Sequence, residues 1–181
     1  MELYEKKLSS EKIFDGRVIH VTLDQIELPN GHKSSREVVN HPGGVCVAAL
    51  NEKNQLYFVK QYRYPYHEVV LELPAGKLEK GSSPLENGIR ELKEEVGAVG
   101  RDYRSLGELY PSPGYTAEII HLFFCRIESL GQDCPDEDEF LDIIPINIDT
   151  AVEMVLNNEI KDSKTQTAVL KTAMLLKKGI L

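Results

Sequence analysis

The sequence predicts a mixed α/β (α+β) domain, because short segments with the two-residue period of β-strands are interleaved with only a few helical segments. Residues 12–28 alternate apolar and polar side chains, and residues 45–50 (VCVAAL) form a short apolar run next to turn signals. From Ser83 onward the pattern changes to that of an amphipathic helix. A chain of 181 residues is long enough to bury its own hydrophobic core.

The N-terminal residues 1–40 are expected to form a small antiparallel β-sheet. The alternating stretch is followed by the turn PNGHK and then by SREVVNH, which has the composition of another strand. We therefore expect two parts, an N-terminal β-sheet over 1–40 and a larger domain over 41–181. The sequence leaves open whether the sheet covers its own subunit or pairs with a second copy.

The larger part is expected to alternate strands with a few helices. VCVAAL and LYFVKQYR (56–63) flank the polar turn NEKN and predict a buried hairpin, and the next strand, VVLELPAG (69–76), should end at Pro-Ala-Gly. Later segments predict a strand, a loop and a strand over 103–127, an acidic loop over 134–140 and a final strand over 141–148. Two helices are expected between Asp149 and Lys178, separated near 161–163.

The helix that follows Ser83 has clear signals at both ends. Ser83 is the expected N-cap, Pro84 suits the first helical position, Glu86 completes a capping box, and Gly97 is a C-terminal stop. At about 100° per residue, one stripe of apolar side chains should face the core. These side chains are Leu85, Ile89, Leu92 and Val96.

Composition and charge exclude several classes of function. The net charge of −8 argues against binding to a nucleic-acid backbone, so an anionic ligand would need local positive charge, for which a divalent metal is the obvious source. The cysteines, Cys46, Cys125 and Cys134, are odd in number and lack metal-site spacing, which indicates reduced thiols and a cytoplasmic protein. The first residues do not resemble a signal peptide, and no apolar run is long enough for a membrane span.

Three glutamates, Glu91, Glu94 and Glu95, occupy one arc of the helix beside its apolar stripe. A solvated surface is the simplest interpretation of such an arc, but like charges one turn apart repel unless they are paired or bind a metal. Their carboxylates can converge, and hard oxygen ligands suit Mg²⁺ or Mn²⁺ better than zinc. Gly88 lies near the same side, which suggests room for a close neighbour or a ligand.

The stretch GKLEKGSSPLENGIRELKEEVGA (76–98) resembles the Nudix box, G-x5-E-x7-REUxEExGU with U an apolar residue. The resemblance implies an α/β/α sandwich with a mixed sheet and hydrolysis of a nucleoside diphosphate linked to another group. One position departs from the pattern, because Ser82 stands where the box has a glutamate that often pairs with the arginine. Glu86 or Glu94, each one turn from Arg90, is expected to replace that partner.

The flanking motifs are similar to those of bacterial ADP-ribose pyrophosphatases, namely SREVVNHPGGV, KQYRYP, ELPAGKLEKG, SPGYTAE and PDEDEF, with Pro113 about fifteen residues after the box. The implied reaction is Mg²⁺-dependent hydrolysis of ADP-ribose to AMP and ribose 5-phosphate. Two alternatives remain open. One is a pyrophosphatase for another nucleotide sugar or an oxidised nucleotide, and the other is a non-catalytic nucleotide sensor.

The same resemblance implies the roles of individual residues. Arg36 and Arg63 would bind the substrate's phosphates, with the loop residues Pro113, Gly114 and Glu118 also facing the substrate. The metals would be held by the carbonyl of Ala75 and by Glu91, Glu94 and Glu95. The catalytic carboxylate would be Glu137 or Glu139 of the acidic loop, with Glu94 as a further candidate. The resemblance also implies a homodimer that exchanges its N-terminal sheets and a small-molecule substrate. The net charge and the short apolar runs predict neither nucleic acid nor membrane as a partner.

Overall fold

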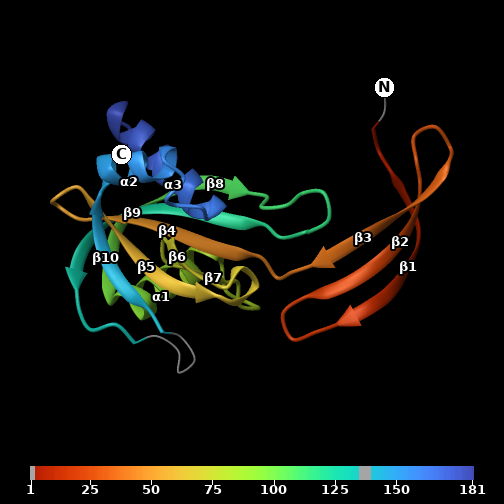
Figure 1. Ribbon diagram of the computed structural model, residues 1–181, viewed down its shortest axis with the longest axis horizontal. Coiled ribbons are helices and arrows are strands. Elements are labelled where there is room, and N and C mark those ends of the chain that lie inside the picture. The colour runs from red at the N-terminus through yellow and green to blue at the C-terminus, as the bar shows by residue number, and fades with distance from the viewer. Residues whose placement is uncertain (1–2, 135–139) are drawn as a thin grey trace. The chain divides into compact units, whose positions relative to one another are not determined.

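The computed structural model describes residues 3–134 and 140–181, which form two compact units. One unit contains the chain up to Gly43 together with Tyr110–Ile119, and the other contains Gly44–Leu109 and Ile120–Leu181. Figure 1 shows the elements of both units in chain order. In the described ranges no helix is long and apolar enough to cross a membrane.

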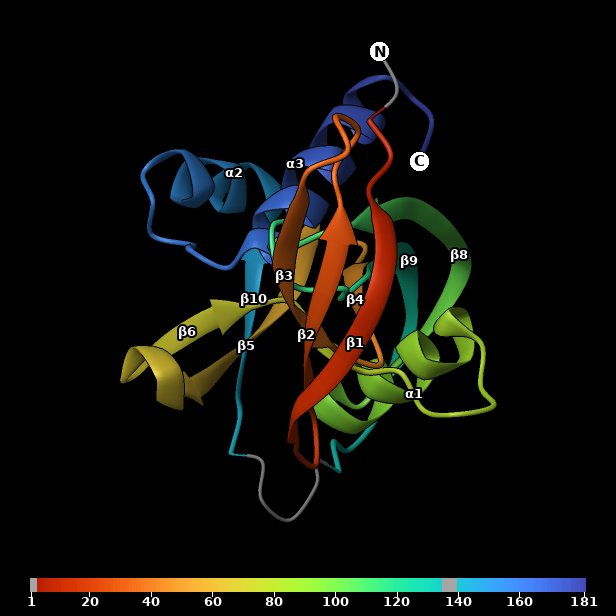
Figure 2. The same ribbon diagram turned by 90° about the vertical axis from the view of Figure 1, so that its right-hand side faces the viewer.

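The first unit is a three-stranded antiparallel sheet, as the sequence predicts. Its strands, β1 (Lys6–Asp15), β2 (His20–Glu27) and β3 (Lys33–Asn40), lie in that order, with β2 in the middle (Figure 2). The segment 110–119 joins this sheet through β3, because Val39 N–H donates to the carbonyl of Tyr115 at 2.8 Å. Ala117 N–H donates in turn to the carbonyl of Val39 at 2.9 Å.

The second unit contains a seven-stranded mixed sheet with a central strand, β4 (Gly44–Leu50). The order is β10-β5-β4-β9-β8, with β6 beside β5 and β7 beside β4, and among the described strands of this sheet only the β4–β9 pair is parallel. The other strands are β5 (Gln55–Arg63), β6 (Glu68–Glu72), β7 (Ala75–Lys77), β8 (Ala98–Leu109), β9 (Ile120–Leu130) and β10 (Asp142–Asn147), and a short 3₁₀ turn, η1 (Tyr64–Tyr66), joins β5 to β6.

Two details of the predicted strands need correction. The strands β4 and β5 do form a hairpin, but they pair only at Leu50 and Leu56, because β9 and β7 take most of the two edges of β4. The second detail is the short strand β7, which was not expected, although the preceding strand does end before Pro-Ala-Gly as predicted. The strand β6 already ends at Glu72, and Ala75 begins β7, because Pro74 interrupts the strand and its carbonyl accepts a hydrogen bond from Val47 N–H at 2.9 Å.

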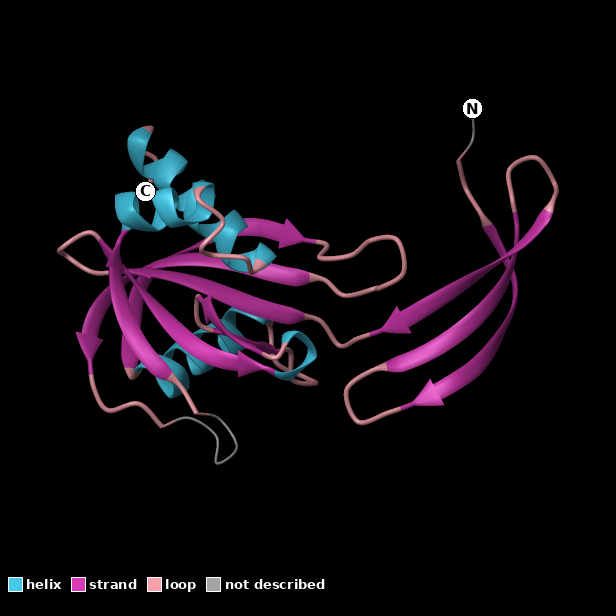
Figure 3. Cartoon of the chain, viewed as in Figure 1, coloured by secondary structure: helices cyan, strands magenta, loops and turns pink. Residues whose placement is uncertain are grey.

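Helices cover both faces of this sheet, which confirms the expected α/β/α sandwich (Figures 1 and 3). The helix α1 (Pro84–Val96) lies on one face, where Leu92 and Val96 pack with Val45 and Val47 of β4. On the other face lie α2 (Ile148–Leu156) and α3 (Ser163–Lys177), separated near the predicted position. The three cysteines are free, as expected.

The ends of α1 are those predicted, but its buried face is different. Ser83 and Glu86 form the capping box, and Gly97 ends the helix with φ of 68°. Ile89, expected in the core, is 42% exposed, whereas Gly88 is buried. A Cβ atom on Gly88 would lie 3.1 Å from the side chains of Val45 and Val47. The missing side chain therefore lets α1 approach β4 closely, and the helix is turned so that Ile89 faces outward.

Candidate active site

The acidic face of α1 lies against the short strand β7. The carboxylate of Glu91 occupies the space beside Gly76, where a Cβ atom would be 1.9 Å from Oε1. Ala75 N–H donates a hydrogen bond to Oε2 of Glu95 at 3.0 Å. Glu91 and Glu95 are only 8% and 2% exposed. Strand β7 thus places two groups beside the buried carboxylates, which lie one helical turn apart on α1. Gly76 leaves space for the carboxylate of Glu91, and the backbone amide of Ala75 donates to Glu95.

Arg90 links several acids at the outer edge of this face. Its Nη1 donates to Glu94 and its Nη2 to Glu91, both at 2.6 Å, and Glu79 lies 3.4 Å from Nη2. Partial burial lowers the pKa of Arg90, but the nearby charges of Glu91, Glu94 and Glu79 outweigh this effect and raise it. Glu94 is therefore one of the partners predicted to replace the glutamate missing from the box.

The other predicted replacement is wrong. Glu86 caps the helix instead, because its Oε2 accepts the backbone N–H of Ser83 at 2.7 Å. Ser82 is exposed, and its N–H donates to the carbonyl of Glu79 at 3.3 Å. Glu79 is a partner of Arg90 that the sequence did not suggest, since it lies outside the helix and only the fold of the preceding loop brings it close.

The glutamates expected to hold metals do not all face the same way. Glu91 and Glu95 face β7, whereas Glu94 lines an open hollow with Arg90, Lys93 and Cys134. Within residues 3–134 and 140–181, no three His, Cys, Asp or Glu side chains are arranged to hold a metal ion. The donors nevertheless suit a hard cation, because Glu91 and Glu95 present buried oxygen ligands beside the backbone of Ala75. Arg90 provides a positive charge 2.6 Å from Oε1 of Glu91.

Arg63 takes part in a buried ionic cluster that the sequence did not suggest. Its Nε and Nη2 donate to the two oxygens of Glu72 at 2.6 and 2.7 Å, which is a bidentate pair. Lys164 donates to Oε2 of Glu72 at 2.5 Å and to Asp162 at 3.0 Å. Burial raises the pKa of Glu72, but Arg63 and Lys164 outweigh this effect and hold it below its usual value. A glutamate between two leucines, in Leu71-Glu72-Leu73, was the available signal.

The remaining predicted residues belong to the first unit or lie outside the described residues. Arg36, on β3, pairs with Glu5 through Nε at 3.0 Å and Nη2 at 2.5 Å. Glu118 lies 3.4 Å from Nδ1 of His41, and its loop also carries the other two predicted residues, Pro113 and Gly114. Glu137 and Glu139 lie outside the described residues.

Comparison with known proteins identifies the fold and the family. The NUDIX domain matches residues 40–164, and the N-terminal domain of nucleoside diphosphate sugar hydrolases matches residues 5–39. A solved structure described as that of an ADP compounds hydrolase has a TM-score of 0.84 over 100% of both chains, at 20% sequence identity. At that identity the likeness concerns the fold alone.

Curated relatives cover nearly the whole chain. A methanol dehydrogenase activator of Bacillus methanolicus is 43% identical over 91% of this chain and 90% of its own length. An ADP-ribose pyrophosphatase of Bacillus subtilis is 39% identical over 92% of this chain and 91% of its own length. A GDP-mannose pyrophosphatase of Yersinia enterocolitica is 31% identical over 72% of this chain and 73% of its own length. Two glutamates of the box, Glu91 and Glu95, lie against β7. Together with this placement, these matches show that the chain belongs to the Nudix family of hydrolases.

Proposed function

We propose that this chain hydrolyses the diphosphate bond of ADP-ribose, with a divalent metal, to give AMP and ribose 5-phosphate. The observation that carries the proposal is the pair of buried carboxylates, Glu91 and Glu95, held against Gly76 and Ala75 of β7. A relative that is 39% identical over nearly the whole chain is named ADP-ribose pyrophosphatase, which supports the choice of substrate.

The proposed metal ligands are Glu91, Glu94, Glu95 and the carbonyl of Ala75. A divalent cation bound there, Mg²⁺ or Mn²⁺, would neutralise the charge of the diphosphate and make water more acidic. To bind the metal, the side chain of Glu94 would have to turn away from Arg90 and toward β7. In the structure Glu94 lines the open hollow with Arg90. The two N–H groups on Nη1 of Arg63 are not used by Glu72 and would be offered to a phosphate oxygen.

The reaction adds one water molecule across the diphosphate. The water oxygen forms a bond to one phosphorus, the bridging P–O bond breaks, and the departing oxygen leaves on the other phosphate. A carboxylate takes the proton of the attacking water and passes it to solvent. Glu94, Glu137 and Glu139 are our candidates for this carboxylate. No covalent intermediate with the protein is needed.

The test is incubation of the purified protein with ADP-ribose and Mg²⁺, followed by chromatography of the products, with ADP-glucose, GDP-mannose and NADH in parallel. We expect AMP and ribose 5-phosphate, formed preferentially from ADP-ribose. The activity should vanish in a chelator and return with Mg²⁺, and turnover that persists in chelator would contradict the proposed chemistry. Binding of ADP-ribose without turnover would favour a sensor. GDP-mannose as the preferred substrate would favour the activity named for the Yersinia relative.

A second candidate function is activation of a methanol dehydrogenase, which is favoured by the relative of that name at 43% identity. The test is to add the purified protein and Mg²⁺ to a methanol dehydrogenase and to measure the rate of methanol oxidation. The control is the Glu95→Gln variant. Activation by the wild type but not by the variant would mean that activation depends on the hydrolytic site, and no activation by either would remove this candidate.

We also propose that the chain acts as a homodimer in which the sheet of residues 1–40 pairs with a second copy. Two exposed apolar side chains on β1, Ile13 and Phe14, at 56% and 53% exposure, are consistent with such pairing. A mass measurement in solution tests this proposal. We expect twice the chain mass of 20.4 kDa. Only monomer at micromolar concentration would contradict it.

A further inference from the structure

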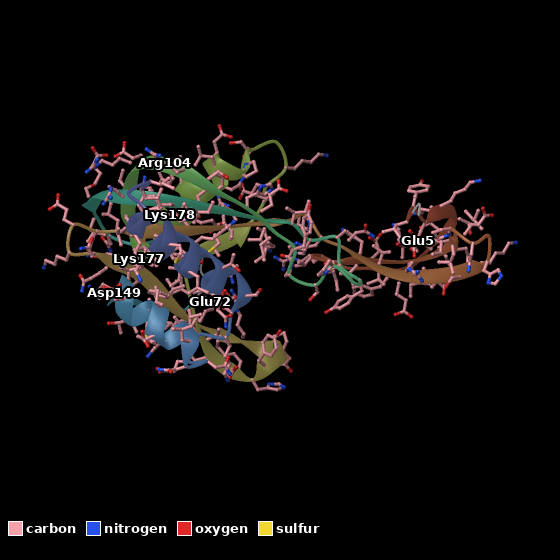
Figure 4. The ribbon with its side chains drawn as sticks, turned by 90° about the horizontal axis from the view of Figure 1, so that it is seen from above. Glu5, Glu72, Arg104, Asp149, Lys177 and Lys178 are labelled. Carbon is pink, nitrogen blue, oxygen red and sulfur yellow. The ribbon has the colours of Figure 1, made fainter. Side chains whose placement is uncertain are left out.

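The cluster around Glu72 links the start of α3 to the strands beside the candidate active site. Glu72 is the last residue of β6, is 2% exposed and lies beside α3 (Figure 4). The next residue, Leu73, donates its N–H to Oγ1 of Thr165 in α3 at 2.9 Å. Two residues further on, Ala75 contacts Glu95. The backbone directly after Glu72 is therefore held by α3 at Leu73 and by the acidic helix at Ala75.

Glu72 determines the orientation of the Arg63 guanidinium. Arg63 ends β5 and its side chain is 37% exposed, so without a partner it would sample many rotamers. The bidentate pair uses Nε and Nη2 and fixes the plane of the guanidinium, which leaves the N–H groups of Nη1 for another acceptor. The hydrogen bond to Glu72 is the main cause that raises the pKa of Arg63, and the charges of Asp162 and Glu95 add to it.

Lys164 supports Glu72 from the opposite side. Its side chain is only 12% exposed, and its ammonium group bridges Glu72 and Asp162, the N-cap residue of α3. Two cations on one carboxylate leave one formal positive charge, which the carboxylate of Asp162 balances. This arrangement keeps Glu72 ionised and immobile, so that the carboxylate acts as a rigid support for Arg63 rather than as a mobile competitor for it.

We propose that Glu72 is a positioning residue, which with Lys164 holds the guanidinium of Arg63 in the orientation that binds the substrate's diphosphate. The proposal rests on the proposed function, because it assigns Arg63 to the phosphates. It makes Glu72 a determinant of substrate affinity that does not itself touch the substrate, and it gives the first turn of α3 an indirect part in phosphate binding through Lys164.

A double-mutant cycle tests the proposal, with the variants Glu72→Gln, Arg63→Ala and both together. The activity is measured on whichever compound of the substrate panel the wild type hydrolyses fastest. If that compound is not ADP-ribose, the proposed substrate is wrong, but the double-mutant cycle still tests the role of Glu72. We expect KM to rise about 30-fold for Arg63→Ala and about 10-fold for Glu72→Gln, with kcat changed less than about threefold. In the Glu72→Gln background, Arg63→Ala should raise KM only about threefold further.

The matched control is Glu68→Gln, the same substitution at the other end of β6. Glu68 forms an exposed pair with Lys161 at 3.0 Å, and its loss should leave both KM and kcat unchanged. Thermal unfolding shows whether each variant is folded at the assay temperature. If Glu72→Gln does not fold, Lys164→Gln takes its place in the cycle, with the same expected dependence on Arg63.

Three results would overturn the proposal. A full 30-fold effect of Arg63→Ala in the Glu72→Gln background would mean that Glu72 contributes to folding but does not orient Arg63. A lower KM in Glu72→Gln would mean that the carboxylate competes with the substrate for the guanidinium. An unchanged KM in Arg63→Ala would remove Arg63 from phosphate binding and with it any positioning role for Glu72, while turnover by the wild type would leave the hydrolytic function in place.

Discussion

Substitution of Gly76 by alanine tests whether the carboxylate of Glu91 must lie where the structure has it. The new Cβ atom would be 1.9 Å from Oε1, 2.0 Å from Cδ and 2.6 Å from Oε2 of Glu91. Reaching the 3.4 Å of ordinary contact requires the carboxylate to move by about 1.5 Å. The side chain of Glu91 can move without a shift of the backbone, so the fold should survive, with a loss in the free energy of unfolding of about 1–3 kcal/mol.

The expected effect on catalysis is larger than the effect on stability. A displacement of about 1 Å in a catalytic group costs about 100-fold in rate, or about 2.7 kcal/mol of transition-state stabilisation. The assay is kcat/KM for ADP-ribose hydrolysis at a temperature where circular dichroism shows the variant to be folded. Gly131→Ala is the matched control, because its Cβ atom would make only an ordinary 3.6 Å contact with the carbonyl of Gly97. A folded Gly76→Ala variant that keeps more than about half of the activity would refute the placement of Glu91 in the reactive site.

Further predictions concern the acidic helix and the buried cluster. Glu95→Gln should lower kcat by about 100-fold or more without unfolding the protein, and an unchanged rate would remove this residue from the metal site. Ser82→Glu should change kcat less than about twofold, since Arg90 already has acidic partners, whereas a large gain would show that the natural box is impaired. Ser83→Ala should cost about 1 kcal/mol in chemical denaturation by removing the N-cap, and no loss would contradict the capping geometry. Because folding lowers the pKa of Glu72, its ionic contribution to stability is complete above its unfolded pKa and is lost as the pH falls through the folded value. The difference in unfolding free energy between wild type and Glu72→Gln should therefore narrow below pH about 4.5, and a constant difference would contradict the lowered pKa.

Local signals predicted much of the fold. The capping box at Ser83 and the stop at Gly97 depend on backbone groups within one turn of the helix, so the sequence contains all the information they need. The outward position of Ile89 was not predictable from the helical period, because Gly88 lets another element approach and so selects the buried face. Periodicity describes one element, whereas this choice depends on a neighbour.

The candidate site was predictable in its residue types and less so in its contacts. The spacing of Glu91 and Glu95 places them one turn apart on a helix, and in the structure both carboxylates lie against the same strand, β7. The cluster of Glu72 with Lys164 joins residues 92 positions apart, and no local pattern indicates such a pair. In the described residues the carboxylates do not form a group of three arranged to hold a metal ion, and Glu94 pairs with Arg90 and lines the open hollow.

The parallel pairing of β4 with β9 has a consequence for the synthesis of the protein. It joins Gly44 to Ile120, and the intervening chain contains the whole acidic helix. Contacts between such distant residues form late, because a long loop must close before they can form. The ribosome therefore synthesises most of the chain before β4, the strand against which α1 packs, can pair with β9. Until then one edge of β4 exposes unpaired backbone groups, which can form hydrogen bonds with another chain. The chain is therefore prone to aggregate in the interval before β9 emerges from the ribosome.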